Sequence, residues 1–277
     1  MFWELNELLL FLVLVAIYWA ATEVGFRLGI RRHATCNDAD RSHASSLQSA
    51  LLGLLALLLG FSFAMAVARY DGRKALVLQE ANAIGTTYLR AGFLAPDQAA
   101  GARKLLRDYV DSRLQFVAAK EDLLDVDQAF ATASALQEHL WAIANAAVAQ
   151  DARSVPAGLF VQTLNEVIDV SEARRAAFTN HVPGAVLALL VAVSCGAMGF
   201  IGFVCGLDGR RGQLATTTFT VLTALVLVII LDMDRPRHGL ITVDQGSMLR
   251  LKASLAGDGS GPPGVSSATP QAKEQEQ

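Results

Sequence analysis

The sequence of 277 residues has few charged side chains and no excess of positive charge. Only 18% of the residues are charged, and 23 Lys and Arg residues stand against 26 Asp and Glu residues. Soluble domains and disordered chains carry more charge than this, so neither class fits. Because no Lys- or Arg-rich cluster offers a surface for phosphates, we expect no nucleic-acid partner.

Cysteine is also scarce, and basic residues are missing from the N-terminus. Two of the three cysteines, Cys195 and Cys205, lie in one apolar run, where a thiol behaves as a small apolar side chain. We therefore predict no disulfide framework. The first residues contain Glu4 and Glu7 where a secretory signal would be basic, so the first apolar run is expected to be a retained helix.

What the sequence has in abundance is apolar residues, at 53% of the chain. They gather in runs without Asp, Glu, Lys or Arg at 8–22, 42–68, 182–207 and 212–231. A bilayer core of about 30 Å needs about 20 helical residues, which the last three runs reach and the first reaches with its flanking residues. The sequence therefore predicts an integral membrane protein with four transmembrane helices.

Between the second and third runs lies a water-exposed segment, 69–181, with 12 basic and 14 acidic residues. Its apolar residues recur at helical rather than strand spacing, which makes the expected fold class all-α. The stripes are Leu105, Leu106, Tyr109, Val110, Leu114 and Val117; Val126, Phe130, Ala133, Leu140, Trp141, Ala144 and Val148; and Phe160, Leu164, Val167 and Ile168.

The expected organisation is two transmembrane hairpins with an extramembrane helical domain between them. Residues 1–68 form the first hairpin, 69–181 a helical stalk and the domain, 182–234 the second hairpin, and 235–277 a C-terminal segment with a disordered tail. One helix is expected from Leu47 to about Gly92, and Pro96 and Pro156 lie near helix starts.

The orientation in the cell membrane is predicted from the number of spans and from the basic residues beside them. Each pair of spans returns the chain to the side on which it started. The two hairpin connections share one side, and the N-terminus, middle domain and C-terminus share the other. Seven basic residues flank the domain side and five the hairpin side, which favours a cytoplasmic domain by a small margin. They are Arg69, Arg73, Lys74, Arg174, Arg175, Arg235 and Arg237 against Arg31, Arg32, Arg41, Arg210 and Arg211.

Two parallel stripes mark the second apolar run. Ala56, Gly60, Ala64 and Ala68 repeat every four residues, which is typical of close helix packing in membranes. One position further on, a second stripe repeats at the same interval. It consists of Leu57, Phe61, Met65 and Arg69.

The second stripe has two interpretations. Around the axis of an oligomer it would form a hydrophobic constriction that ends in a ring of arginines, as in pores gated by dewetting. The structural alternative is lipid or core contact, with Arg69 reaching the membrane edge. Periodicity alone favours this alternative.

A resemblance adds to the pore interpretation. Leu59-Gly60-Phe61 and Ala68-Arg69-Tyr70-Asp71-Gly72-Arg73 resemble the second helix of bestrophin channels. With residues 80–86 (Glu-Ala-Asn-Ala-Ile-Gly-Thr) and 232–241 (Asp-Met-Asp-Arg-Pro-Arg-His-Gly-Leu-Ile), the chain is similar to a bacterial bestrophin-like membrane protein family of unsettled function.

The resemblance to bestrophins implies a homopentamer with a pore lined by the second helix. Leu57 and Phe61 match the family's apolar neck positions, and Gly53 stands where a third bulky residue is expected. The family's calcium site needs a dense acidic cluster, and this chain offers Asp232 and Asp234. We therefore expect no calcium gating; Arg69, if it faces the pore, argues for anions.

No other pattern predicts a catalytic, cofactor or metal site. The sequence lacks a phosphate-binding glycine loop, a nucleophile elbow and a metalloprotease motif, so we expect no enzyme. His33, Cys36, Asp38, Asp40 and His43 crowd one connection, but their spacing fits no zinc site.

Four further polar residues have structural interpretations. Glu23 and Arg27 are one helical turn apart and are expected to pair. Glu80 and Asn82 would either bind an ion or make hydrogen bonds between helices, and the second outcome is the commoner.

The resulting hypothesis is a bestrophin-like homo-oligomeric channel that passes small anions such as chloride across the lipid bilayer. The alternative is a non-conducting membrane scaffold or sensor whose helical domain binds a partner. A transporter would need a broken helix, for which Gly196, Gly199 and Gly202 are the only hint.

Overall fold

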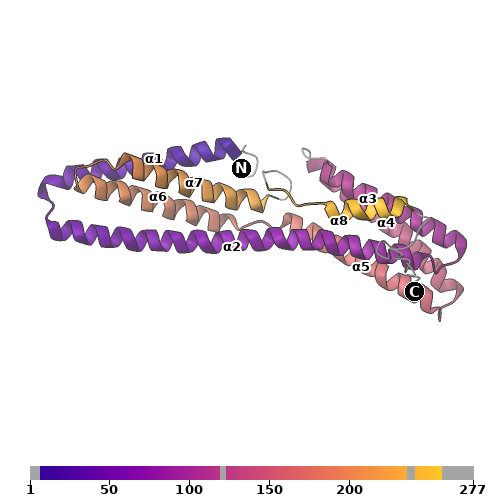
Figure 1. The fold of residues 1–277 in the computed structure, drawn as a ribbon. Helices are drawn as coiled ribbons and strands as arrows, with labels where there is room; N and C mark the ends of the chain where they lie inside the picture. The colour runs from indigo at the N-terminus through magenta and orange to yellow at the C-terminus, as the bar shows by residue number, and fades with distance from the viewer. Residues whose placement is uncertain (1–6, 119–122, 236–240, 258–277) are drawn as a thin grey trace, which may run out of the picture. The chain divides into compact units, whose positions relative to one another are not determined.

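The computed structural model describes residues 7–118, 123–235 and 241–257. All regular elements in these ranges are helices (Figure 1), which confirms the predicted all-α class. They are α1 (Glu7–Arg32), the 3-10 helix η1 (His33–Thr35), α2 (Asp38–Ala91), α3 (Pro96–Ala118), α4 (Leu123–Gln150), α5 (Val155–Thr179), α6 (Gly184–Leu207), α7 (Gln213–Asp234) and α8 (Gly246–Ala256). The predicted tail from 258 onward and residues 236–240 of the C-terminal motif lie outside the described residues.

Four helical stretches within the described ranges are long and apolar enough to cross a bilayer, as predicted. The longest single helix among them, α2, has 54 residues and confirms the continuous helix expected after Leu47. The helix begins at Asp38, nine residues before the expected start at Leu47, because Asn37 caps it. The Asp40 amide donates to Asn37 Oδ1 at 2.8 Å, which satisfies one of the free N–H groups of the first turn.

The contacts divide the chain into two compact units. The first unit comprises 1–76 and 170–244, and the second comprises 77–169 and 245–277. The first unit contains α1, α6 and α7 together with the N-terminal part of α2. Its apolar core includes one stripe of α1, formed by Leu10, Leu14 and Tyr18, which packs with Leu190 of α6 and Leu227 of α7.

The closest helix packing in the first unit joins α1 to α6. A Cβ atom added at Gly25 would overlap the backbone oxygen of Gly199, and one added at Gly202 would overlap that of Thr22. A Cβ added at Gly29 would similarly overlap the backbone of α6. We call this contact the glycine seam; its members are Gly25, Gly29, Gly199, Gly202 and Gly206.

The seam also corrects an expectation about α6. This helix runs without interruption from Gly184 to Leu207, so the broken helix suggested by its glycines is wrong. Two of these glycines, Gly199 and Gly202, serve instead to let two backbones approach.

The second unit has its own core of helical side chains from α2, α3, α4, α5 and α8. The three predicted apolar stripes contribute Leu106, Tyr109, Leu140, Phe160 and Leu164, all fully buried. Val148, predicted with them, is 37% exposed because it lies near the end of α4.

A buried polar cluster lies in the same core. The Tyr109 hydroxyl donates to Glu80 Oε1 at 2.8 Å, and Arg113 Nε lies 3.0 Å from the same oxygen. Gln137 Nε2 donates to the Tyr109 hydroxyl at 3.2 Å. Glu80 therefore makes interhelical bonds, which confirms the commoner of the two outcomes expected for it.

Candidate functional site

The part of α2 in the first unit has one covered side and one open side. Leu55, Ser62 and Ala66 are buried, and their spacing of seven and four residues places them on one side of the helix. Ala66 packs against Ile230 and Met233 of α7. This side holds α2 against the rest of the first unit.

The open side carries the predicted neck. Leu57 is 55% exposed and Phe61 is 67% exposed, although both belong to the charge-free apolar run. Met65 is only partly exposed because it packs against the apolar core of the first unit. Arg69 Nη1 donates to Asn180 Oδ1 at 3.0 Å. Two of the four predicted neck residues thus lie fully on the open side, and Met65 and Arg69 lie toward its edge.

The small-residue stripe also lies on the open side. Ala56, Gly60, Ala64 and Ala68 are all exposed. A Cβ atom added at Gly60, or at Gly53 two turns earlier, would meet no atom within 4 Å. In the described part of the chain, no helix packs closely on this stripe.

The C-terminal end of α7 fixes α2 just beyond the stripe. Arg73 is 7% exposed, and its Nη2 donates to the Met233 carbonyl at 2.6 Å. The side chain of Asp234 accepts a bond from the Val182 amide at 2.8 Å, and that of Asp232 accepts one from the Ile241 amide at 2.9 Å. Both carboxylates thus bind backbone amides of neighbouring segments.

The described ranges contain no cluster of three or more His, Cys, Asp or Glu side chains that could hold a metal ion. In the connection that is rich in such residues, Asp40 takes part in capping α2, and His33 Nδ1 lies 2.6 Å from the Leu207 carbonyl oxygen. The second contact places this connection beside the turn after α6, in which Gly209 has a φ of 68°.

The predicted pair of Glu23 and Arg27 is confirmed, with Arg27 Nε 2.8 Å from Glu23 Oε1. The structure adds Arg211, whose Nη1 lies 3.0 Å from Glu23 Oε2. Sequence reasoning missed this partner, and it missed Asn180 and the anchoring role of Arg73. Only Arg73 had a local signal, because it follows Arg69 by one helical turn.

These features define a class: an all-helical membrane protein in which one long helix keeps an apolar side uncovered. The family model of the bestrophin-like domain matches residues 16–248. The chain therefore belongs to the bestrophin-like family.

Solved structures agree with this assignment at the level of the fold. A bacterial bestrophin homolog from Klebsiella pneumoniae is 16% identical and has a TM-score of 0.64, with 90% of this chain and 97% of that chain covered. A single-residue variant of that homolog is 14% identical with a TM-score of 0.66, covering 91% of this chain and 98% of that one. No curated protein matches the chain.

Proposed function

We propose that the protein is a homo-oligomeric channel, a pentamer, that passes small anions such as chloride through a pore lined by α2. The observation that carries the proposal is the open side of α2, where Leu57 and Phe61 are exposed in the single chain. The family supports it as well, because characterised bestrophins are ion channels.

The chemistry of the open side fits a narrow hydrophobic gate. Rings of Leu57 and Phe61 around an axis would exclude water and raise the barrier to ion passage. Gly53 leaves the preceding ring without side chains, which shortens the gate. At the other end Arg69, held by Asn180, supplies positive charge that attracts anions and repels cations.

The small-residue stripe is the proposed contact between subunits. Ala56, Gly60, Ala64 and Ala68 are adjacent to the neck on the helix surface, so a neighbouring α2 can approach there without covering Leu57 and Phe61. In this proposal residues 1–68 and 182–234 form two transmembrane hairpins in the cell membrane, and 69–181, the N-terminus and 235–277 are cytoplasmic.

Planar-bilayer recording of the purified protein tests the channel. We expect replacement of Leu57 and Phe61 by alanine to raise the conductance about tenfold, as a barrier lowered by about 1.4 kcal/mol would do. The matched control replaces Leu12 of α1 and Leu222 of α7, which are equally apolar and 53% exposed, and it should leave the current unchanged.

Two results would overturn the proposal. One is a stable oligomer that does not conduct even with alanine at both neck positions. The other is a monomer or dimer by light scattering, which would favour the non-conducting scaffold. Reversal potentials in a chloride gradient test selectivity, and a shift toward cations in Arg69→Gln is the expected result.

A further inference from the structure

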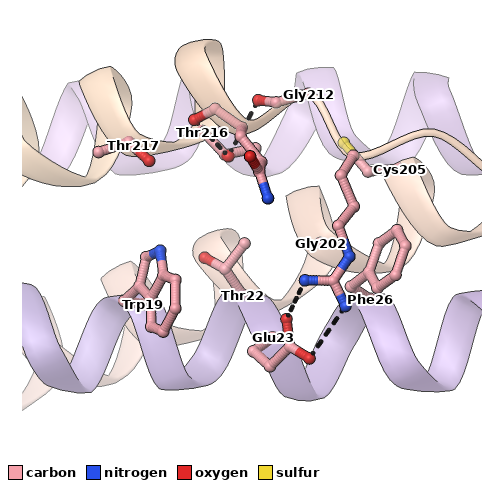
Figure 2. A pocket seen from close by; sticks show the side chains of 11 residues that line it. Trp19, Thr22, Glu23, Phe26, Gly202, Cys205, Gly212, Thr216 and Thr217 are labelled. Atoms are coloured by element: carbon pink, nitrogen blue, oxygen red, sulfur yellow. Dashed lines mark hydrogen bonds and ion pairs between the residues drawn. The ribbon is translucent and has the colours of Figure 1, made fainter.

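A pocket of about 210 Å³ lies in the first unit, and none of its lining residues belongs to α2. Figure 2 shows Trp19 and Thr22 along one wall and Thr216 and Thr217 along the other. The walls come from α1, α6, the start of α7 and the residues just before α7. No function considered above uses this pocket.

Arg211 and Glu23 are the charged residues that line the pocket and they balance each other, while Arg27 adds one positive charge beside the pocket without lining it. Arg211 binds both oxygens of Glu23, through Nη1 at 3.0 Å and Nη2 at 3.3 Å. Arg27 donates to the same carboxylate at 2.8 Å, so two guanidinium groups face one acid. With both of its oxygens already bound, Glu23 is poorly suited to bind a cation from solution.

Arg211 is both fixed in position and able to donate further bonds. Its guanidinium carbon lies 4.3 Å from the centre of the Phe26 ring, which orients the guanidinium plane. A guanidinium has five N–H groups, and Glu23 accepts from two of them. The remaining donors match the planar pairs of oxygens that phosphate presents.

Uncharged donors complete the lining. The side chains of Gln213 and Thr217 line the pocket and make no hydrogen bond within the described residues. By contrast, the hydroxyl groups of Thr22 and Thr216 donate to backbone carbonyls of their own helices. The pocket therefore offers one amide and one hydroxyl to an incoming acceptor.

The residues around the pocket are typical of a membrane interface. The pocket lies where the apolar run of α7 begins, and its Trp19 is 58% exposed, as is typical of aromatic residues at the membrane interface. Toward the middle of the spans, Leu12 precedes Trp19 by two turns and is 53% exposed. On α7, Leu214 and Leu225 are 85% and 44% exposed and lie on one face, three turns apart.

We propose that this pocket binds the phosphate group of a phospholipid, with Arg211 as the charged donor and Gln213 and Thr217 as uncharged donors. The acyl chains lie on the exposed apolar side chains of α1 and α7. An anionic phospholipid is favoured over a zwitterionic one because Arg27, beside the pocket, and Arg211 together outnumber the single acid Glu23. This proposal does not depend on ion conduction.

The experiment is native mass spectrometry of the full chain in detergent, titrated with phosphatidylglycerol. We expect Arg211→Gln to weaken binding about tenfold, which corresponds to about 1.4 kcal/mol. The matched control is Arg210→Gln, because Arg210 carries the same charge one residue earlier and does not line the pocket. A second variant, Thr217→Phe, fills the pocket without changing its charge and should also weaken binding. Unchanged melting temperatures establish that the variants are folded.

Three outcomes would overturn the proposal. In the first, Arg211→Gln and Arg210→Gln bind phosphatidylglycerol equally well. In the second, a glucosyl diacylglycerol with the same acyl chains, which has no phosphate, binds as tightly as phosphatidylglycerol. In the third, inorganic phosphate alone binds the lipid-free protein and displaces phosphatidylglycerol, which would make the pocket a site for free anions.

Discussion

The first unit contains two sets of small residues with the same sequence spacing and opposite surroundings. In the glycine seam, Gly25 and Gly29 on α1 face Gly202 and Gly206 on α6, and their backbones touch. On α2, Gly60 belongs to a stripe of the same four-residue period, and nothing lies within 4 Å of a Cβ added there. One set packs within the chain, whereas no described residue packs closely on the glycine of the other.

The difference shows what a small-residue stripe means in a membrane helix. Such a stripe predicts close approach of another helix, but it does not say whether that helix belongs to the same chain. The contacts observed within the chain show which stripes already have a partner helix there. Because the glycines of α1 and α6 already pack on each other, we propose the uncovered stripe of α2 as the contact with a second copy of the protein.

The largest effect should come from adding volume to the seam. Gly202→Val would push a branched side chain into the backbone of α1, and we expect it to cost about 3 kcal/mol or more of unfolding free energy, at the upper end for overpacked sites. Gly60→Val is the matched control: it meets no described atom within the chain, so it should lose only the stability that the subunit contact adds, and less than Gly202→Val loses. Thermal unfolding in detergent measures both.

The mass of the oligomer further distinguishes Gly60→Val from Gly202→Val. Gly60→Val should reduce the mass found by light scattering, since it places bulk in the proposed contact between subunits. If instead Gly60→Val unfolds the chain as readily as Gly202→Val, the open side of α2 is covered within the chain and the comparison fails.

A middle-sized effect is expected at the anchor of α2. Because the open side of α2 makes few contacts, its position depends on the covered side, where Arg73 donates to the Met233 and Asp234 carbonyls. Arg73→Met removes those bonds and should cost about 2 kcal/mol, within the range for a buried group left without its partner. Chemical denaturation in detergent measures the loss, and Lys74→Met, an exposed neighbour, is the control. If Arg73→Met and Lys74→Met are equally stable, Arg73 does not hold α2 in place.

The smallest effect is expected at the start of α2. Asn37→Ala removes the cap and should cost about 1 kcal/mol, as is typical of N-cap substitutions. Asn37→Asp retains a side-chain acceptor and should restore most of the stability. A loss equal to that of the alanine variant would mean that the cap does not stabilise the helix.

Periodicity and charge predicted the all-helical class, the four apolar spans and the unbroken run of α2 to about residue 91, because these depend on local composition; the start of α2 was predicted nine residues too late. The pair of Glu23 and Arg27 was predictable for the same reason. Arg211 was not, because it lies 188 residues from Glu23 and only the fold brings them together. The glycine seam had a visible signal in the spacing of Gly25 with Gly29 and of Gly202 with Gly206. Its partner helices still required the structure.

The central claim is that the open side of α2 lines an ion pathway, and thiol accessibility tests it most directly. In a background with alanine at Cys36, Cys195 and Cys205, Phe61→Cys is compared with Leu222→Cys during bilayer recording. A negatively charged methanethiosulfonate reagent should block the current of Phe61→Cys and leave that of Leu222→Cys unchanged, with mass spectrometry verifying that both thiols react. Full labelling at position 61 with an undiminished current would contradict the claim.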